Sequence, residues 1–378
     1  MKGTNIHTAF VSTNSICQGE QVPIFWKELL SLGVIINFAH RTFRWDSEAS
    51  LKAHVHCVII GFALSKQSKN VLYSSEKMMI VDNINPYLVS APTIIIENRN
   101  KCINKNAPQI YYGSMPIDDG HLILNQKEVD DLIAENEENK KYIRKYVGGA
   151  ELIKGKDRWC LWLENVSPKE IRNSNIIMER IKLTQEFRKS SNRPQTLALA
   201  DTPTLFGEIR QPKTDMIVIP KVSSENRRYI PISFITPDII VNGSALIIPD
   251  ASIYHFGVLI SNVHMCWMRT VAGRMKSDYQ YSGSVVYNNF PWCDPTPEQK
   301  AKIEQTAQAI LDARALYPDC SLADLYDETV MPPELRKAHQ ANDRAVMQAY
   351  GFDVKTMTES SCVAELMKMY KKITEKIK

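Results

Sequence analysis

The fold is decided by the opening stretch Thr8-Ala-Phe-Val-Ser-Thr-Asn-Ser15, which is followed by Cys17-Gln-Gly-Glu-Gln21. Residues 8–13 predict a buried strand, because a short run of β-favouring residues ends at two turn formers. An amphipathic helix follows and ends before Gly33, with apolar residues at helical spacing: Ile24, Phe25, Leu29 and Leu30. Two further apolar strands are expected at 33–38 and 54–64. A β-α-β run that starts at residue 8 predicts one piece of a larger α/β domain that is cut or split here.

The composition is that of a globular protein with room for two or three domains in 378 residues. No window approaches 18 uninterrupted apolar residues, so we expect no membrane partner. The start of the chain has no charged-then-apolar signal segment, and the eight cysteines are scattered without a C-x-x-C pair. These features predict a cytoplasmic protein with reduced thiols and no metal site.

The charges are unevenly distributed along the chain, although the formal net charge is only +4. Residues 118–139 hold eight acidic side chains and one lysine, whereas residues 180–230 hold ten basic side chains and five acidic ones. A basic middle between neutral or acidic flanks is typical of a domain that contacts phosphates. A solvated surface of mixed charge fits the same numbers equally well.

The pattern of strands and helices predicts a mixed α+β chain with a partial α/β sheet, an α+β middle and an all-helical tail. We place the first part at 1–64, a polar linker at 65–85, the middle at 86–290 and the tail at 291–378. Short strands are expected at 93–96, 159–163, 216–219 and 245–248, and helices at 126–138, 173–190 and 261–273. Tail helices are expected at 296–316, 333–350 and 359–377; the first has Thr296 as N-cap and Gln299 placed for a capping box.

The first candidate functional cluster is the segment 40–46, which we expect to be a loop between the second and third strands. It carries two aromatic residues and two arginines: Phe43, Trp45, Arg41 and Arg44. Such a loop could stack on a base and hold phosphates. The alternative is that both rings cap the edge of the sheet as core residues.

Two further clusters lie in the basic middle. One joins Glu208, Arg210 and Lys213 to Ser224, Glu225, Arg227 and Arg228, and the other comprises Arg269, Arg274, Lys276, Tyr279 and Tyr281. Arginine suits phosphate or guanine, and glutamate can accept a hydrogen bond from cytosine. We expect Glu208 and Arg210 to read a C·G pair and the Glu225/Arg227 pair to be structural or to face phosphates. Surface ion pairing, and cations at a helix C-terminus, are the alternatives.

Several motifs of cofactor-dependent enzymes are missing from the chain. There is no glycine-rich nucleotide loop, no P-loop and no Asn/Asp-Pro-Pro-Tyr/Phe sequence; the nearest segment is Asn85-Pro-Tyr87. The Glu138-Asn-Lys140 spacing of metal-dependent nucleases lies at a Glu/Lys-rich helix end and is interpreted as a solvated face. We therefore expect this chain to bind no cofactor and no metal by itself.

Taken together, the segments resemble the C-terminal part of MmeI-like type II restriction–modification enzymes and related adenine DNA methyltransferases. The resemblance covers nearly the whole chain and rests on Phe10-Val-Ser-Thr-Asn-Ser-Ile-Cys-Gln-Gly-Glu-Gln-Val22, Ile36-Asn-Phe-Ala-His-Arg-Thr-Phe-Arg-Trp45, Pro220-Lys-Val-Ser-Ser-Glu-Asn-Arg-Arg-Tyr-Ile-Pro231, His264-Met-Cys-Trp-Met-Arg269, Gly273-Arg-Met-Lys-Ser-Asp-Tyr-Gln-Tyr-Ser282, Tyr287-Asn-Asn-Phe-Pro-Trp292, Ser321-Leu-Ala-Asp-Leu-Tyr-Asp327 and Met331-Pro-Pro-Glu-Leu335.

The resemblance implies that 1–64 is the end of a Rossmann-like methyltransferase sheet, that 86–290 is a DNA target recognition domain and that 291–378 is a helical C-terminal region. It also implies that Phe43, or else Trp45, stacks on a flipped adenine. The family's S-adenosylmethionine site, catalytic motif and nuclease domain are missing here. We therefore expect duplex DNA and a methyltransferase half, in the same or a separate chain, as partners. Two alternatives are a half-enzyme that becomes active with that second chain and an unrelated scaffold protein.

Overall fold

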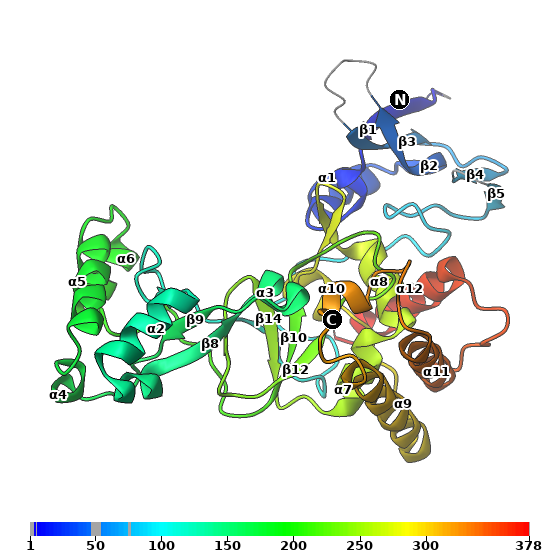
Figure 1. The fold of residues 1–378 in the computed structure, drawn as a ribbon. Coiled ribbons are helices and arrows are strands. Elements are labelled where there is room, and N and C mark those ends of the chain that lie inside the picture. The colour runs from blue at the N-terminus through cyan, green and yellow to red at the C-terminus, as the bar shows by residue number, and fades with distance from the viewer. Residues whose placement is uncertain (1–3, 5, 47–53, 75–76, 378) are drawn as a thin grey trace.

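The computed structural model describes residues 4, 6–46, 54–74 and 77–377. Its first part is a five-stranded sheet with the order β1-β3-β2-β4-β5, seen at the top of Figure 1. The strands are β1 (Thr8–Thr13), β2 (Ile35–Asp46), β3 (His54–Ala63), β4 (Asn70–Tyr73) and β5 (Met78–Val81), with helix α1 (Gln21–Ser31) between β1 and β2. Because β3 is antiparallel to both β1 and β2, these two strands run in one direction and end at the same edge. Cys57 of β3 pairs with Thr13 on one side and Phe43 on the other.

Three sequence-based predictions need correction in this sheet. Segment 40–46 is the second half of β2 and not a loop; the ladder accommodates it through a register shift between His40 and Phe43. Segment 65–85 is more than a linker, because β4 pairs with β2 and β5 pairs with β4. β1 is a strand as predicted, but most of its side chains are exposed, since it is the outer strand of the described sheet.

The middle part contains three small sheets and is mixed α+β. One sheet has the order β12-β10-β14-β6, with β12 at Ser233–Ile235, β10 at Met216–Pro220, β14 at Ala245–Pro249 and β6 at Tyr111–Tyr112. A second joins β11 (Val222–Ser223), β16 (Asp278–Gln280) and β15 (Gly273–Met275). The third has the order β13-β8-β9-β7, with β13 at Ile240–Val241, β8 at Ile143–Val147, β9 at Trp159–Leu161 and β7 at Ile123–Leu124. The strand expected at 93–96 has no ladder partner.

The third sheet belongs to an arm that projects on the left of Figure 1 and has its own apolar core. Its helices are α2 (Gln126–Glu135), α4 (Pro168–Ile171), α5 (Asn175–Lys189) and α6 (Pro194–Ala198). Closer to the centre lie α3 (Gly149–Lys154), α7 (Ile253–Ile260) and α8 (Asn262–Val271), followed by one turn of π-helix at Gly283–Tyr287. The helices predicted at 126–138, 173–190 and 261–273 thus form, within a few residues.

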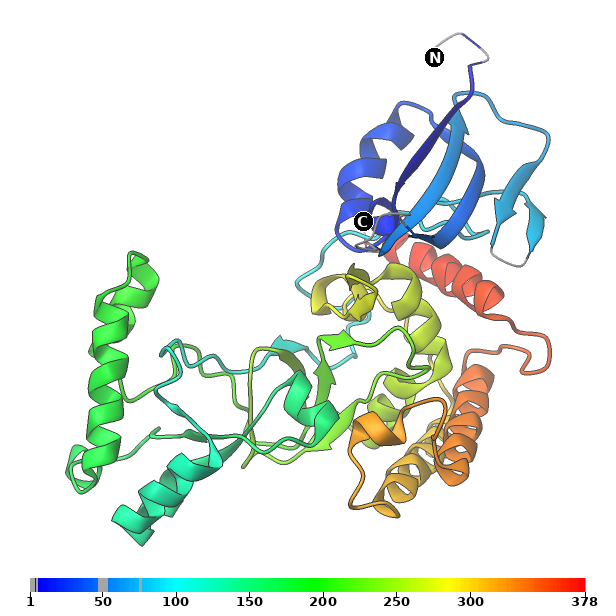
Figure 2. The ribbon, with the colours of Figure 1, turned by 45° about the horizontal axis from the view of Figure 1, so that its top comes forward.

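The tail is helical, as predicted, and comprises α9 (Pro297–Ala315), α10 (Leu322–Leu325), α11 (Pro333–Ala349) and α12 (Glu359–Glu375). The expected capping box starts α9: the Gln299 N–H donates to Thr296 Oγ1 at 3.3 Å, and the Thr296 N–H donates to Gln299 Oε1 at 2.9 Å. In Figure 2, α12 lies between the five-stranded sheet and the other tail helices.

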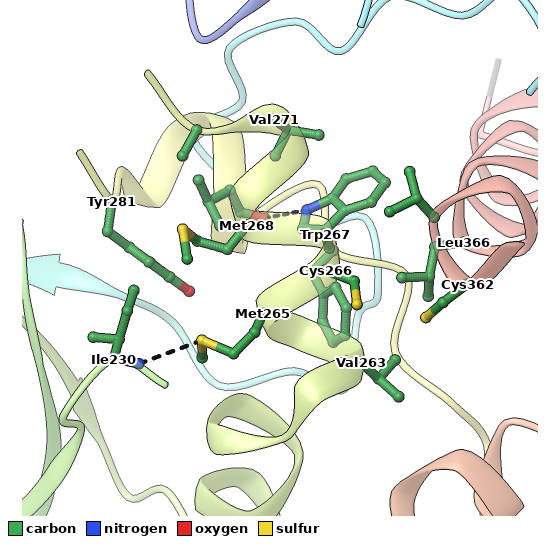
Figure 3. Packing of buried hydrophobic residues seen from close by; sticks show 14 of the residues in the cluster. Ile230, Val263, Met265, Cys266, Trp267, Met268, Val271, Tyr281, Cys362 and Leu366 are labelled. Atoms are coloured by element: carbon green, nitrogen blue, oxygen red, sulfur yellow. Dashed lines mark hydrogen bonds between the residues drawn. The ribbon is translucent and has the colours of Figure 1, made fainter. Parts of the chain in front are cut away.

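One hydrophobic core contains residues from all three parts. Helix α8 runs through it and meets α12, as Figure 3 shows for Cys266 and Cys362. The Trp267 indole N–H donates to the carbonyl oxygen of Val286 at 3.0 Å, so the largest buried ring in α8 also satisfies its polar group. The sheet, the middle and the tail are therefore packed against one another around α8.

A candidate nucleic-acid interface

At the edge of the sheet where β1 and β2 end, the turn that follows β1 contacts the end of α8 and the start of β15. After β1 the chain forms a turn of 3-10 helix (Asn14–Cys17) and reaches Gly19, whose N–H donates to the carbonyl oxygen of Val271 at 3.0 Å. Gly19 has a φ of +56°, and a Cβ on it would lie 2.9 Å from the Cα atom of Gly273. Glycine is therefore required here for both the backbone conformation and the close approach.

Two cavities of ≈ 350 and ≈ 460 Å³ flank this contact and share Gln18 and Arg274 in their walls. The smaller one is also lined by Arg41, Thr42, Tyr87, Arg269, Tyr279 and Glu359, and the larger one by Ser15, Tyr112, Lys221, Lys276, Gln280 and Ser282. The buried atoms Gln18 Oε1 and Arg274 Nε have no hydrogen-bond partner in the described structure. Polar groups of this kind can receive a polar ligand.

The predicted stacking residues lie on β2 at the same edge. The Phe43 ring is half-buried, with its centroid 4.9 Å from that of His40 and 6.2 Å from that of Trp45. Trp45 is 53% exposed. Arg44, beside them, is exposed. Neither ring is among the buried core residues, and Trp45 is the more exposed of the two.

Two of the arginines predicted to contact DNA are held by internal partners instead. Arg41 Nε donates to the Leu88 carbonyl at 2.9 Å, and burial lowers the pKa of this guanidinium, although Glu359 opposes the shift. Arg269 forms an ion pair with Glu359 at 2.7 Å and donates to the Arg228 carbonyl at 3.0 Å. Both guanidiniums thus also hold α12 against the rest of the protein, Arg41 through Ser360 and Arg269 through Glu359, and their contact with DNA stays a prediction.

Both predicted tyrosines are buried. Tyr281 is 1% exposed, and its hydroxyl and His264 Nε2 share a hydrogen bond of 2.9 Å. Tyr279 is 7% exposed and lies under Arg274, whose guanidinium carbon is 4.0 Å from the ring centroid. Tyr281 is thus a core residue, whereas the Tyr279 ring packs against the Arg274 guanidinium.

Arg274 and Lys276 both line the larger cavity, which is called the hairpin groove from here on. Arg274 forms an ion pair with Glu225 at 3.1 Å and donates to the Ser277 carbonyl at 2.7 Å, so Glu225 pairs with it and not with Arg227. Lys276 is exposed at the tip of the β15–β16 hairpin.

The segment 224–228 is a turn beside the hairpin. Ser224 Oγ accepts from the Asn226 N–H at 3.3 Å, which makes this serine a turn residue. Burial lowers the pKa of the half-buried Arg227, while Asp278 and Asp327 act in the opposite direction. Arg228 is exposed, with its guanidinium carbon 5.7 Å from the centroid of the Tyr229 ring. Arg228 is thus the most accessible cation of this turn.

Glu208 and Arg210 form an ion pair with each other, and each side chain keeps more than a third of its surface exposed. Glu208 forms an isolated antiparallel β-bridge with Met115. The two residues exchange both backbone hydrogen bonds at 2.9 Å, and this bridge holds the backbone that carries the pair. The Arg210 N–H donates to Ser114 Oγ at 3.0 Å. Lys213 is exposed on the following loop.

Three residues of this surface escaped the sequence analysis: Tyr111, Tyr112 and Lys221. Both tyrosines lie on β6 and are close to half exposed, and Lys221 Nζ lies 4.8 Å from the centroid of the Tyr112 ring. Because 111–115 runs from the larger cavity to the Met115–Glu208 bridge, it connects the hairpin groove to the Glu208–Arg210 pair. The adjacent tyrosines were the only available signal, and two neighbouring aromatic residues do not by themselves indicate a ligand.

Among the described residues there is no cluster of three or more His, Cys, Asp or Glu side chains that could hold a metal ion. Within the same residues no helix combines the length and the apolarity needed to cross a membrane.

Comparison with protein-family models accounts for nearly the whole chain. Residues 1–74 match the DNA-methyltransferase domain of MmeI, residues 90–294 its target recognition domain and residues 295–378 its C-terminal domain. The chain belongs to the MmeI family. The resemblance noted in the sequence is thereby confirmed, and so is the mixed α+β fold.

A curated protein and a solved structure illustrate what the chain is similar to. DNA methyltransferase A of Bacillus subtilis (strain 168) is 38% identical over 374 residues, which are 99% of this chain and 42% of that protein. The solved structure of the type IIL restriction–modification enzyme MmeI in complex with DNA is 46% identical and superposes with a TM-score of 0.89. It matches 99% of this chain and 50% of its own. The chain therefore spans about half the length of the relatives it matches.

Proposed function

We propose that this chain is the DNA-binding target recognition portion of a site-specific adenine-N6 DNA methyltransferase of a restriction–modification system. The carrying observation is the match over 99% of the chain to a restriction–modification enzyme solved with DNA. The groove beside the β15–β16 hairpin supports the same function, because Lys221, Arg274 and Lys276 line one continuous polar surface. We place the protein in the cytoplasm, where the DNA it would bind is found.

Duplex DNA is the proposed ligand, and its binding should depend strongly on salt. Each phosphate neutralised by Lys or Arg releases counterions, and the groove and the Glu208–Arg210 region offer about five exposed or half-exposed cations. Between roughly 50 and 200 mM salt we therefore expect affinity to fall about 10²- to 10³-fold, measured by fluorescence anisotropy on a labelled duplex.

A charge-matched pair of variants tests whether the groove is the binding surface. Replacing Lys221 and Lys276 by Gln should flatten the salt dependence, whereas replacing Lys302 and Lys337 by Gln, at exposed positions of α9 and α11 far from the hairpin, should leave it unchanged. Affinity that is flat with salt, or an equal loss in both variants, would contradict DNA binding at this groove.

We also propose that this chain does not bind S-adenosylmethionine by itself. In the complete enzyme, another half would carry the binding site for it. The observation that favours such a partner is the outer strand β1, which exposes apolar side chains on both faces: Phe10 is 48% and Val11 is 59% exposed. Ile24 on the neighbouring α1 is 71% exposed. Outer strands with exposed apolar faces are sites at which another strand adds. A half-enzyme is thus the second candidate function.

Reconstitution with a methyltransferase half that carries the Asn-Pro-Pro-Tyr segment tests both the partner and the role of Phe43. The mixture should methylate adenine, while this chain alone should give no calorimetric signal with S-adenosylmethionine.

Stacking on an aromatic ring contributes roughly 1–3 kcal/mol per base, so Phe43→Ala should lower methylation about 5- to 150-fold with DNA affinity nearly unchanged. Trp45→Ala is the matched comparison. Unfolding of the Phe43→Ala protein would show that this ring stabilises the sheet and does not serve the adenine.

A further inference from the structure

Arg188 in helix α5 is completely buried. All five N–H donors of its guanidinium reach backbone carbonyls. Nε donates to Ile117 at 2.9 Å, and the other four bonds go to Leu199 at 3.0 Å, Thr202 at 2.9 Å, Pro116 at 2.8 Å and Leu205 at 2.8 Å. Lysine has only three donors on a single nitrogen, so no other side chain could replace this set of contacts.

The five carbonyls belong to two segments, 116–117 and 199–205, that lead directly into the bridge presenting the Glu208–Arg210 pair. Pro116 follows Met115, which exchanges its backbone hydrogen bonds with Glu208. The Pro116 carbonyl accepts from both Arg188 and the Gly207 N–H, the latter at 2.9 Å. Arg188 therefore binds the backbone on both sides of the bridge: at Pro116, next to Met115, and at Leu205, three residues before Glu208.

The backbone at this place is strained, and Arg188 opposes its relaxation. Ile117 has a φ of +51°, which a β-branched residue rarely adopts. A strained conformation persists only when several contacts fix it, and the Ile117 carbonyl is one of the Arg188 acceptors. A Cβ on Gly207 would lie 2.7 Å from Ile117 Cδ1, so the facing segment is fitted closely against the strained one.

We propose that Arg188 is a positioning residue for base recognition, which acts through the Glu208–Arg210 pair without touching DNA. This inference rests on the proposed function and deepens it. Arg188 fixes the distance and angle between the two segments, and the bridge transmits that geometry to the pair. A base contact needs a defined direction as well as a donor or acceptor. Loss of the Arg188 hydrogen bonds should therefore weaken discrimination at the base pair that Glu208 and Arg210 read.

The full chain is incubated with a pool of randomised duplexes, and the bound fraction is sequenced. The wild type should prefer particular bases at several positions. Arg188→Gln should lower the preference at one position roughly tenfold or more while the other positions and the salt dependence stay unchanged. Gly207→Ala, which disturbs the same bridge and leaves Arg188 in place, should affect the same position.

Arg180→Gln is the matched control. Arg180 lies two turns earlier in α5 and is bound to the carbonyls of His121 and Ile123, so it stabilises the arm without touching the bridge. It should destabilise the arm and leave base preference intact. In a second control, Arg188→Gln in an Arg210→Ala background should have no further effect on preference, because the pair it acts through is already broken.

The outcomes separate the inference from the proposed function. Absence of any base preference in the wild type would overturn the proposed function and, with it, this inference. A wild-type preference that Arg188→Gln or Gly207→Ala leaves intact would overturn the inference alone. The same holds if Arg180→Gln alters that position as strongly as Arg188→Gln. If Arg188→Gln does not fold, Gly207→Ala decides.

Discussion

Exchanging the charges of the Glu208–Arg210 pair, as Glu208→Lys with Arg210→Asp, should change the preferred base at one position of the DNA site. The pair is half exposed and is held on a hydrogen-bonded bridge, so its atoms have defined directions toward a partner. Glutamate accepts from cytosine and arginine donates to guanine, and each good contact discriminates by roughly 1–3 kcal/mol. With both contacts reversed, the original base pair should be disfavoured by about 10²-fold or more.

The measurement is the base preference of the reconstituted enzyme, scored as methylation of a duplex pool. The matched control exchanges Lys182 and Glu186, an exposed ion pair on α5 with a separation of 3.9 Å that conserves the same charges away from the bridge. That exchange should leave every position unchanged. A uniform loss of binding to all sequences in the Glu208/Arg210 variant would show that these residues position the protein and do not read bases.

The sequence was sufficient where local signals determine the structure. The strand Thr8–Thr13, the helix that follows it and the capping box that starts α9 depend on neighbours within a few residues. They form as predicted. The second half of β2 was taken for a loop because arginine and aromatic residues suggested a ligand-binding turn. In the structure the same residues continue the ladder after a bulge, which no local pattern specifies.

The candidate site was predicted only in part, because the same residue types serve surface and interior. Arg269 was predicted to contact DNA, yet its guanidinium also donates to a carboxylate and a carbonyl from distant segments. Tyr281 was predicted to belong to a DNA-binding cluster, and it is a buried residue that bonds to a buried histidine. Conversely, Tyr112 and Lys221 become one surface only because β6 and the end of β10 meet in space. Burial depends on tertiary partners, which residue type and spacing do not reveal.

Mild acid should destabilise the protein by roughly 2–4 kcal/mol between about pH 6.5 and 5. His264 and His339 are completely buried, and burial lowers the pKa of His264 from 6.5 to about 3 and that of His339 well below 6.5. In the unfolded chain both rings take up a proton near pH 6.5, whereas in the folded protein neither does so until much lower pH. Stability is therefore complete above pH 6.5 and is lost as the pH falls below it.

The hydrogen bonds of the two buried rings and the pKa of one buried carboxyl also determine how stability depends on pH. His264 Nε2 shares its bond with Tyr281 and His339 Nε2 with Tyr326, while Nδ1 of each ring has no partner that could stabilise the charged form. Burial raises the pKa of Asp343, so this carboxyl contributes stability as the pH falls and offsets part of the loss. Burial also lowers the pKa of the half-buried His255 to about 4, with Lys300 acting in the same direction. Three histidines against one carboxyl leave a net loss.

Urea unfolding at pH 7.5, 6.5 and 5 measures the effect as a falling free energy of unfolding. The double variant His264→Phe with Tyr281→Phe removes both partners of one bond, so it leaves no buried polar group unsatisfied and should reduce the slope of stability against pH by about a third. His121→Gln, at a half-exposed position of the arm, should leave the slope unchanged. A slope equal to wild type in the double variant would rule out His264 as a source of acid sensitivity.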